Sequence, residues 1–198
     1  MNSQYGMVFY PQNACFEKIA SENSNQMLAG LSNEGFLGEF FSICYEGQKE
    51  AQTGYLIGDN FLKLITFLGC SPHLAVSPPE KIADWGNFCH IEIQQHQSPI
   101  FYKGLNNSRS SCPQCKSRVV KILPEMEQWV PDSMHIVCPK CHHTSLVEDL
   151  NWRHSAGFGT FFIIIHSVYP NEAVPTEKLL SLLKLESSEN WDYFYYEL

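Results

Sequence analysis

Two stretches far apart in the chain share one pattern of aromatic and branched apolar residues. GEFFSICY begins at Gly38 and GTFFIIIH begins at Gly159, and both fit G-x-F-F-x-I. Runs of this composition are typical of β-strands. The pattern therefore predicts a strand at each place.

A helical pattern follows each predicted strand. In GDNFLKLITFLG, Asp59 is a plausible N-cap and Gly69 a stop signal. Thr176 to Glu186 form the second segment. The apolar residues expected on the buried faces are Phe61, Leu64, Ile65 and Leu68 in the first and Leu179, Leu182 and Leu183 in the second.

A further strand is predicted after each helix, as NFCHIEI from Asn87 and as NWDYFYYEL from Asn190. The order is then βαβ twice. Two such units in series favour an α+β fold with a ferredoxin-like sheet, in which four antiparallel strands carry two helices on one face. The alternative is an unrelated α+β sheet. ACFEKIASENSNQMLAGL, near the N-terminus, is interpreted as a helix.

Composition allows one domain of ordinary size, or one domain with a small added module. The 198 residues are 44% hydrophobic and include 13 Phe, which is enough for a core. The formal net charge of −8 disfavours long-range attraction to nucleic acid. Residues 103–150 are the exception, because they hold six Lys or Arg against five Asp or Glu.

No targeting or membrane-spanning segment is predicted. The N-terminal stretch lacks the basic start and apolar centre of a signal peptide, and the longest strongly apolar run, FFIII, is far too short to cross a bilayer. These features predict a cytoplasmic protein without membrane insertion. In that compartment, eight cysteines are better interpreted as metal ligands and buried thiols than as disulfides.

Two CPxC pairs carry the clearest chemistry, in RSSCPQCKSRVV and HIVCPKCHHTSLVE. Zinc prefers four tetrahedral ligands, and thiolates satisfy it without leaving an open position. Residues 108–149 resemble a zinc ribbon. The resemblance implies one structural Zn²⁺ held by Cys112, Cys115, Cys138 and Cys141.

The sequence departs from the zinc-ribbon pattern at two positions. Ribbon knuckles often carry Gly after the second cysteine, where this chain has Lys116 and His142. Rubredoxin-like iron and a redox dithiol are the alternatives to zinc. His142 and His143 are expected to lie on the surface or near the metal rather than to bind it.

These assignments divide the chain into four parts. Residues 1–35 form an N-terminal segment that is helical at least in part. Residues 36–103 form the first βαβ half, 104–150 the zinc-ribbon insertion, and 151–198 the second βαβ half. The insertion replaces the hairpin that usually joins the second and third strands, where added segments are tolerated.

Other candidate residues give weaker signals. Cys70 and His73 could form a nucleophile and base, but a helix C-terminus disfavours a thiolate. Cys89 shares strand parity with apolar residues and is expected in the core, whereas His90 and Glu92 are expected to face solvent. The aromatic tail WDYFYYEL could cover the sheet or be partly exposed.

Three functions follow from these features. The first is a cytoplasmic, non-catalytic zinc-ribbon adaptor that binds a protein complex, with Trp129 and Tyr196 as exposed contacts. The alternative is a nucleic-acid- or ribosome-associated protein, and the third is a cysteine-dependent enzyme that uses Cys70. The nucleic-acid contacts would be Lys103, Arg109, Lys116, Arg118, Lys121 and Lys140.

The stretches FLGCSPHL, WRHSAGFGTFF and WDYFYYEL also resemble an uncharacterised bacterial protein family. That resemblance implies no activity.

Overall fold

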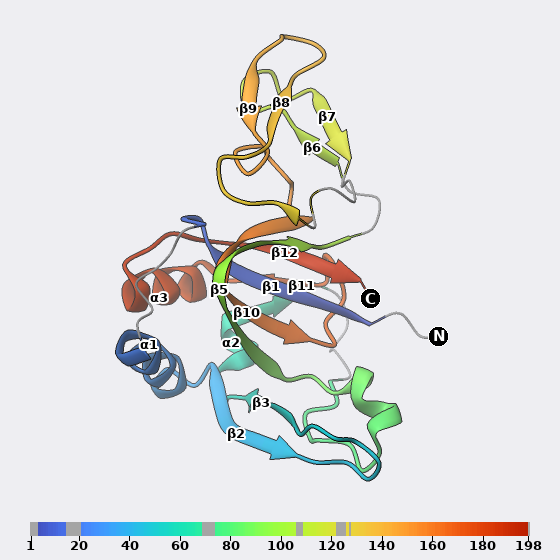
Figure 1. Cartoon of the computed structure of the whole chain (residues 1–198). Helices are drawn as coiled ribbons and strands as arrows, with labels where there is room; N and C mark the ends of the chain where they lie inside the picture. The colour runs from blue at the N-terminus through green and yellow to red at the C-terminus, as the bar shows by residue number, and fades with distance from the viewer. Residues whose placement is uncertain are drawn as a thin grey trace.

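A computed structural model describes residues 4–14, 21–68, 74–105, 109–121, 126 and 128–197. Within these residues, a six-stranded antiparallel sheet with the order β12-β1-β10-β5-β3-β2 forms the body of the fold (Figure 1). Its strands are β1 (Tyr5–Pro11), β2 (Leu37–Ile43), β3 (Gln52–Ile57), β5 (Ile91–Lys103), β10 (Ala156–His166) and β12 (Trp191–Glu197).

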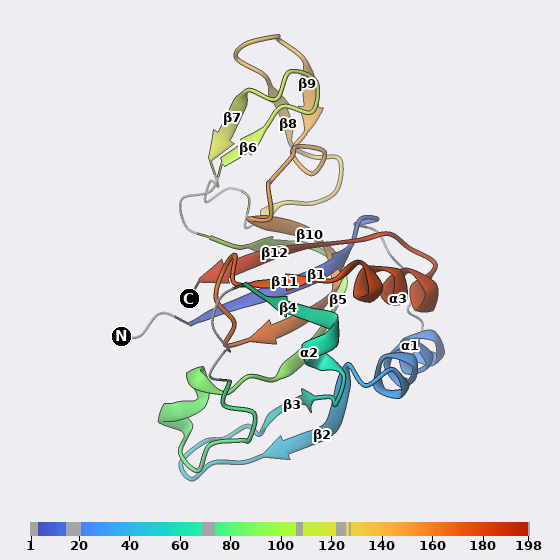
Figure 2. The ribbon, with the colours of Figure 1, turned by 180° about the vertical axis from the view of Figure 1, so that it is seen from behind.

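Two helices and a small second sheet lie against the larger sheet. The helices are α1 (Ser21–Asn33) and α3 (Glu177–Ser187). Figure 2, seen from behind, shows the two-stranded sheet of β4 (Ile65–Phe67) and β11 (Ala173–Pro175) in front of the larger one. The one-turn α2 (Phe61–Leu64) precedes β4, and the 3₁₀ helix η1 (Ile82–Asn87) precedes β5.

The main core lies between the sheet and the two helices. Met27 and Leu31 of α1 and Leu179 and Leu183 of α3 are fully or almost fully buried in this core. The opposite face of the sheet carries a second buried layer. Because β10 is covered on both faces, ten of its eleven residues are buried. This explains its nearly continuous apolar sequence.

The structure confirms several of the predicted elements. GEFFSICY overlaps β2, GTFFIIIH lies in β10, and WDYFYYE forms β12. The predicted helix near Thr176 is α3, in which the Thr176 hydroxyl caps the helix by accepting a hydrogen bond from Leu179 N.

The prediction of a helix from Asp59 to Gly69 is wrong beyond its first turn. The helix α2 ends at Leu64, and Ile65 to Phe67 form a strand that pairs with β11. Branched and aromatic residues favour a strand once a partner strand is present. The N-cap is Asn60 rather than Asp59, and Gly69 lies outside the described residues.

The interior position of β1 corrects the predicted sheet arrangement. This strand, from the segment expected to be at least partly helical, pairs with β12 on one side and β10 on the other. The expected first strand, β2, instead lies at the far edge beside β3. The fold is therefore mixed α and β, but GEFFSICY and GTFFIIIH do not occupy neighbouring positions in its sheet.

The cysteine pairs lie between β5 and β10, in a projection that we call the cysteine module (the described residues from 109 to 151). Figure 1 shows it extending from one end of the sheet. It contains two hairpins, formed by β6 (Arg109–Ser111) with β7 (Arg118–Lys121) and by β8 (His135–Val137) with β9 (Thr144–Leu146).

A hydrophobic cluster joins the module to the sheet. Trp129, Leu150 and Trp152 pack with Phe101 of β5 and Phe158 of β10. The module base is therefore attached by buried side chains as well as by the chain connections.

In the described part of the chain, no helix has both the length and the apolar character needed to cross a membrane.

Candidate metal centre

The four cysteines of the module converge on one point. The sulfurs of Cys112 and Cys141 lie 3.7 Å apart and those of Cys115 and Cys138 lie 3.6 Å apart. All four Sγ atoms lie within 4.8 Å of one another. A zinc ion with Zn–S bonds of about 2.3 Å needs sulfurs roughly 3.8 Å apart at the corners of a tetrahedron. The sulfur spacing therefore fits a four-thiolate metal site.

Each CPxC pair lies in a turn between two short strands, and the two turns share one hydrogen-bond pattern. In the first, Cys112 N donates to Ser117 O (2.9 Å) and Lys116 N donates to Cys112 O (3.0 Å). In the second, Cys138 N donates to His143 O (2.9 Å) and His142 N donates to Cys138 O (3.0 Å). Local backbone geometry thus presents two sulfurs from each turn.

The residue after each pair adopts left-handed backbone geometry. Lys116 has φ 61° and His142 has φ 57°. These are the positions where the zinc-ribbon pattern often has Gly, which enters this region without steric cost. Both residues are exposed. Lys116 and His142 therefore adopt the left-handed turn geometry that Gly would adopt more easily, at a cost in backbone strain.

A serine hydroxyl lies directly beside the sulfurs. Ser117 Oγ is 2.9 Å from Cys115 Sγ and 3.3 Å from Cys138 Sγ. Hydrogen bonding from this hydroxyl contributes most to lowering the pKa of Cys138 to about 5. At Cys141 the His143 backbone favours the thiolate, but partial loss of hydration and the other three sulfurs outweigh it and raise the pKa to about 12. The sulfurs thus compete for negative charge, which a divalent cation would relieve.

The donor set determines what this site can do. Four thiolates complete a tetrahedral zinc shell and leave no position for a substrate or a reactive water. Cys112 and Cys138 are buried, and Cys141 is exposed. Iron also accepts four thiolates. The geometry therefore fits a structural metal ion, with zinc favoured by the ligand type.

No family model, no curated protein and no solved structure matches this chain.

Four of the six predicted nucleic-acid contacts have described side-chain exposure. Lys116, Arg118 and Lys140 are exposed on the cysteine module, and Lys103 is exposed at the end of β5. Arg109 and Lys121 are backbone partners across the β6–β7 hairpin. Three exposed cations therefore share the module, while Lys103 lies on the sheet.

The two aromatic residues predicted as exposed protein contacts are buried. Trp129 is 4% exposed and its indole N–H donates to Glu148. Tyr196 is 2% exposed and its hydroxyl bonds to His166. The expectation of exposure is wrong for both residues, because Trp129 attaches the module and Tyr196 covers the second face of the sheet.

Cys70 and His73 lie outside the described residues. Cys89 is fully buried in the main core, as its strand parity predicted. His90 was expected to face solvent, but it is only 3% exposed. It stacks between Phe88 and His166, which the sequence-based interpretation missed.

A polar cluster surrounds that histidine pair. His166 Nε2 lies 2.8 Å from a Glu92 carboxylate oxygen, and His166 Nδ1 lies 2.6 Å from the Tyr196 hydroxyl. The alternation that places His90 and Glu92 on one face of the chain is visible in the sequence. Their meeting with His166 depends on the β5–β10 register, in which Ile91 faces Ile165.

Proposed function

We propose that this chain is a non-catalytic adaptor of the cytoplasm, in which a structural Zn²⁺ supports a projecting recognition module. The observation that carries the proposal is the closed arrangement of four cysteine sulfurs, with pairs 3.6 and 3.7 Å apart. Such a site stabilises a fold and offers no place for a reacting group. Binding would then be the task of the surface that the metal supports.

We further propose that the module is a zinc ribbon inserted in a ferredoxin-like sheet. Two hairpins with matching cysteine turns support the first part. The sheet order β12-β1-β10-β5, with α1 after β1 and α3 after β10, supports the second. In this version β1, rather than β2, is the first strand, and the β2–β3 hairpin is an addition at one edge.

Metal content is the first test of the proposal. Purified protein is expected to contain one zinc per chain, and Co²⁺ substitution is expected to give the absorption of a tetrahedral four-thiolate site. Cys138→Ser should lose most of this metal, whereas Cys44→Ser, at an exposed cysteine outside the cluster, should keep it. Equal metal loss in both variants would contradict the assignment of ligands.

Partner binding is tested on the projecting module. Val137 of β8 is an apolar side chain that is 57% exposed there, and Leu185 of α3 is 77% exposed away from it. Val137→Asp should reduce co-purification of protein partners from the native cell, whereas the control Leu185→Asp should not. The same partners in both variants would count against recognition through this face.

Nucleic-acid binding is the second candidate, supported by the exposed Lys116, Arg118 and Lys140 on the module. Partners that disappear after nuclease treatment would favour it. Binding of a short RNA should then weaken steeply with added salt. Arg118→Glu with Lys140→Glu should lower the affinity at least tenfold, while Lys63→Glu, on α2, should not.

A further inference from the structure

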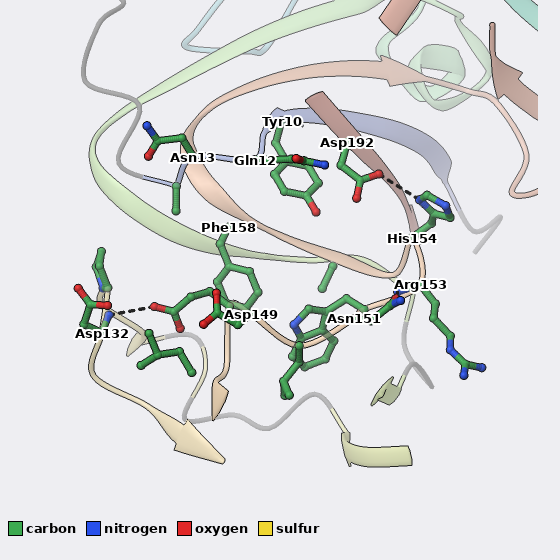
Figure 3. A pocket seen from close by; sticks show the side chains of 17 residues that line it. Tyr10, Gln12, Asn13, Asp132, Asp149, Asn151, Arg153, His154, Phe158 and Asp192 are labelled. Atoms are coloured by element: carbon green, nitrogen blue, oxygen red, sulfur yellow. Dashed lines mark hydrogen bonds and ion pairs between the residues drawn. The ribbon is translucent and has the colours of Figure 1, made fainter. Parts of the chain in front are cut away.

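A cavity of about 620 Å³ lies where the cysteine module meets the sheet (Figure 3). Its walls come from the end of β1, the start of β10, the start of β12, the loop around Asp132 and the segment that joins β9 to β10. This volume lies within the range of about 300–1,000 Å³ that is usual for small-ligand pockets. The metal site lies elsewhere, because none of its four cysteines lines the cavity.

Aromatic side chains form part of the cavity wall. Trp152 and Phe158 are each 5% exposed and belong to the cluster that attaches the module. Tyr10, which is half-buried, lies at the same cavity, with its ring packed on Phe194 of β12. Trp152 and Phe158 contact each other and both contact Phe101, so this part of the wall is held by packing within the chain.

Four of the residues that line the cavity are acidic, and their carboxylates differ in the partners they already have. Both oxygens of Glu148 accept hydrogen bonds, from Trp129 Nε1 and from Asp132 N. Asp149 is exposed, and among the described residues its carboxylate has no hydrogen-bond or ionic partner. Asp192 uses one oxygen, Oδ1, for Tyr193 N and for His154. Negative charge therefore remains available at Asp149 and Asp192.

Of the two basic residues at the cavity, only His154 is paired with one of these carboxylates, and the hydrogen bond with Asp192 contributes most to raising the pKa of His154. Figure 3 shows the Arg153 side chain extending away from Asp149 and Asp192. The His154 ring stacks on Tyr193 at 4.2 Å between ring centroids, and its Nδ1 lies 3.5 Å from Asp192 Oδ1. His154 Nδ1 also lies 2.6 Å from the Tyr193 carbonyl oxygen, so His154 is engaged with β12 and not with Asp149.

We infer that this cavity binds an organic cation, an alkylammonium or guanidinium group, between the carboxylates of Asp149 and Asp192 and the rings of Tyr10, Trp152 and Phe158. Aromatic faces and carboxylates both attract such cations, and attraction to aromatic faces strengthens where water is displaced. A single metal ion fits less well. Among the described residues, only the four cysteines converge closely enough to hold one.

The cation could belong to a free amine or to a Lys or Arg side chain of a protein partner, and the chemistry of recognition is the same for both. The inference does not depend on the proposed adaptor function, because the residues named here as its wall all belong to one chain. Metal content and cation binding also give separate readouts. Failure of one therefore leaves the other open to test.

Titration of the zinc-loaded full chain tests the inference. The probes are spermidine, argininamide and a neutral-ended tetrapeptide with one Arg, with the matching Gln tetrapeptide as control. Binding is followed by calorimetry and by backbone amide NMR shifts. At least one cationic probe should bind with a Kd below about 1 mM, which corresponds to roughly 4 kcal/mol. The Gln peptide should not bind.

Charge-removing variants locate the binding. Asp149→Asn and Asp192→Asn should each raise the Kd of the cationic probe at least fivefold, and Asp149→Arg should abolish binding. Asp59→Asn, at an exposed residue that does not line the cavity, should leave the Kd unchanged. Binding by the peptide alone assigns the cation to a protein partner, and binding by a free amine assigns it to a small molecule.

Two results would overturn the inference. One is the absence of binding by all three cationic probes up to 10 mM, a threshold about tenfold above the expected Kd. The other is binding that Asp149→Asn and Asp192→Asn leave within twofold of the parent protein. Unchanged amide spectra and metal content in these variants would show that the fold is intact.

Discussion

His90 and His166 lie with their imidazole rings stacked, 4.3 Å apart between centroids and inclined by only 13°. Their partners differ. His166 lies between Glu92 and the Tyr196 hydroxyl, whereas His90 Nδ1 lies 2.8 Å from the Phe88 carbonyl oxygen. Because a carbonyl only accepts, His90 carries its proton on Nδ1 when neutral. Burial, followed by the charge of His166, lowers the pKa of His90 to about 4.

This pairing predicts that the fold loses stability as the pH falls from about 6.5 to about 4. In that window the unfolded chain binds a proton at His90 and the folded chain does not, so acid favours unfolding. The loss from this residue is on the order of 3 kcal/mol at its largest. Urea unfolding measured at intervals of pH would detect it.

His90→Asn separates this effect from other titrations, because it keeps a donor near the Phe88 carbonyl but cannot titrate. The variant should be less stable at pH 7 because it lacks the stacked ring, yet its stability should change less between pH 6.5 and 4.5. Glu92, whose pKa is lowered chiefly by the hydrogen bond to His166, loses its contribution below that window. If the unfolding free energy of the variant still fell with pH as steeply as that of the parent protein, His90 would not be the titrating group. The matched control is His135→Asn, at an exposed histidine.

Left-handed geometry at the cysteine turns predicts a stabilising substitution. Lys116→Gly and His142→Gly remove a side chain from residues with φ near 60°. Removing the side chain relieves backbone strain of roughly 1–2 kcal/mol. The greater conformational freedom of Gly in the unfolded chain offsets about 0.5–1 kcal/mol of that gain in folding free energy. Each variant should therefore raise the Tm of the zinc form slightly. Lys140→Gly should lower the Tm, since Lys140 is not among the residues with positive φ. A Tm that falls in Lys116→Gly or His142→Gly would show that the lysine or histidine side chain stabilises its turn.

The cysteine site could be predicted from sequence because each turn supplies two ligands from residues three apart, so local spacing nearly determines the geometry. The β10 strand was also predictable, because burial on both faces requires a continuous apolar run. In contrast, β4 forms only because Ile65 to Phe67 meet Ala173 to Pro175 from a distant segment. The His90–His166 stack likewise depends on strand register, which no single segment specifies.

The Ser117 hydroxyl should strengthen metal binding through its contacts with two sulfurs, at 2.9 and 3.3 Å. A hydrogen bond to a thiolate disperses its charge and holds its orientation. Ser117→Ala is expected to weaken zinc binding about 10-fold or more, as measured by competition with a chelator of known affinity. Ser133→Ala, whose parent hydroxyl bonds to Val130 O away from the sulfurs, should retain the parent affinity. Equal affinities in the two variants would exclude a role for the Ser117 hydroxyl.

Trp129 should hold the module against the sheet. The centroids of its ring and the Phe158 ring lie 4.8 Å apart, and its indole N–H donates a hydrogen bond to Glu148. Trp129→Ala leaves a cavity in this cluster and is expected to cost about 3–5 kcal/mol of unfolding free energy. Leu185→Ala, at an exposed residue of α3, should change it by less than about 0.5 kcal/mol. Co²⁺ absorption should survive in Trp129→Ala, since Trp129 is not a ligand. Loss of the metal spectrum together with stability would show instead that the cysteine turns depend on docking against the sheet.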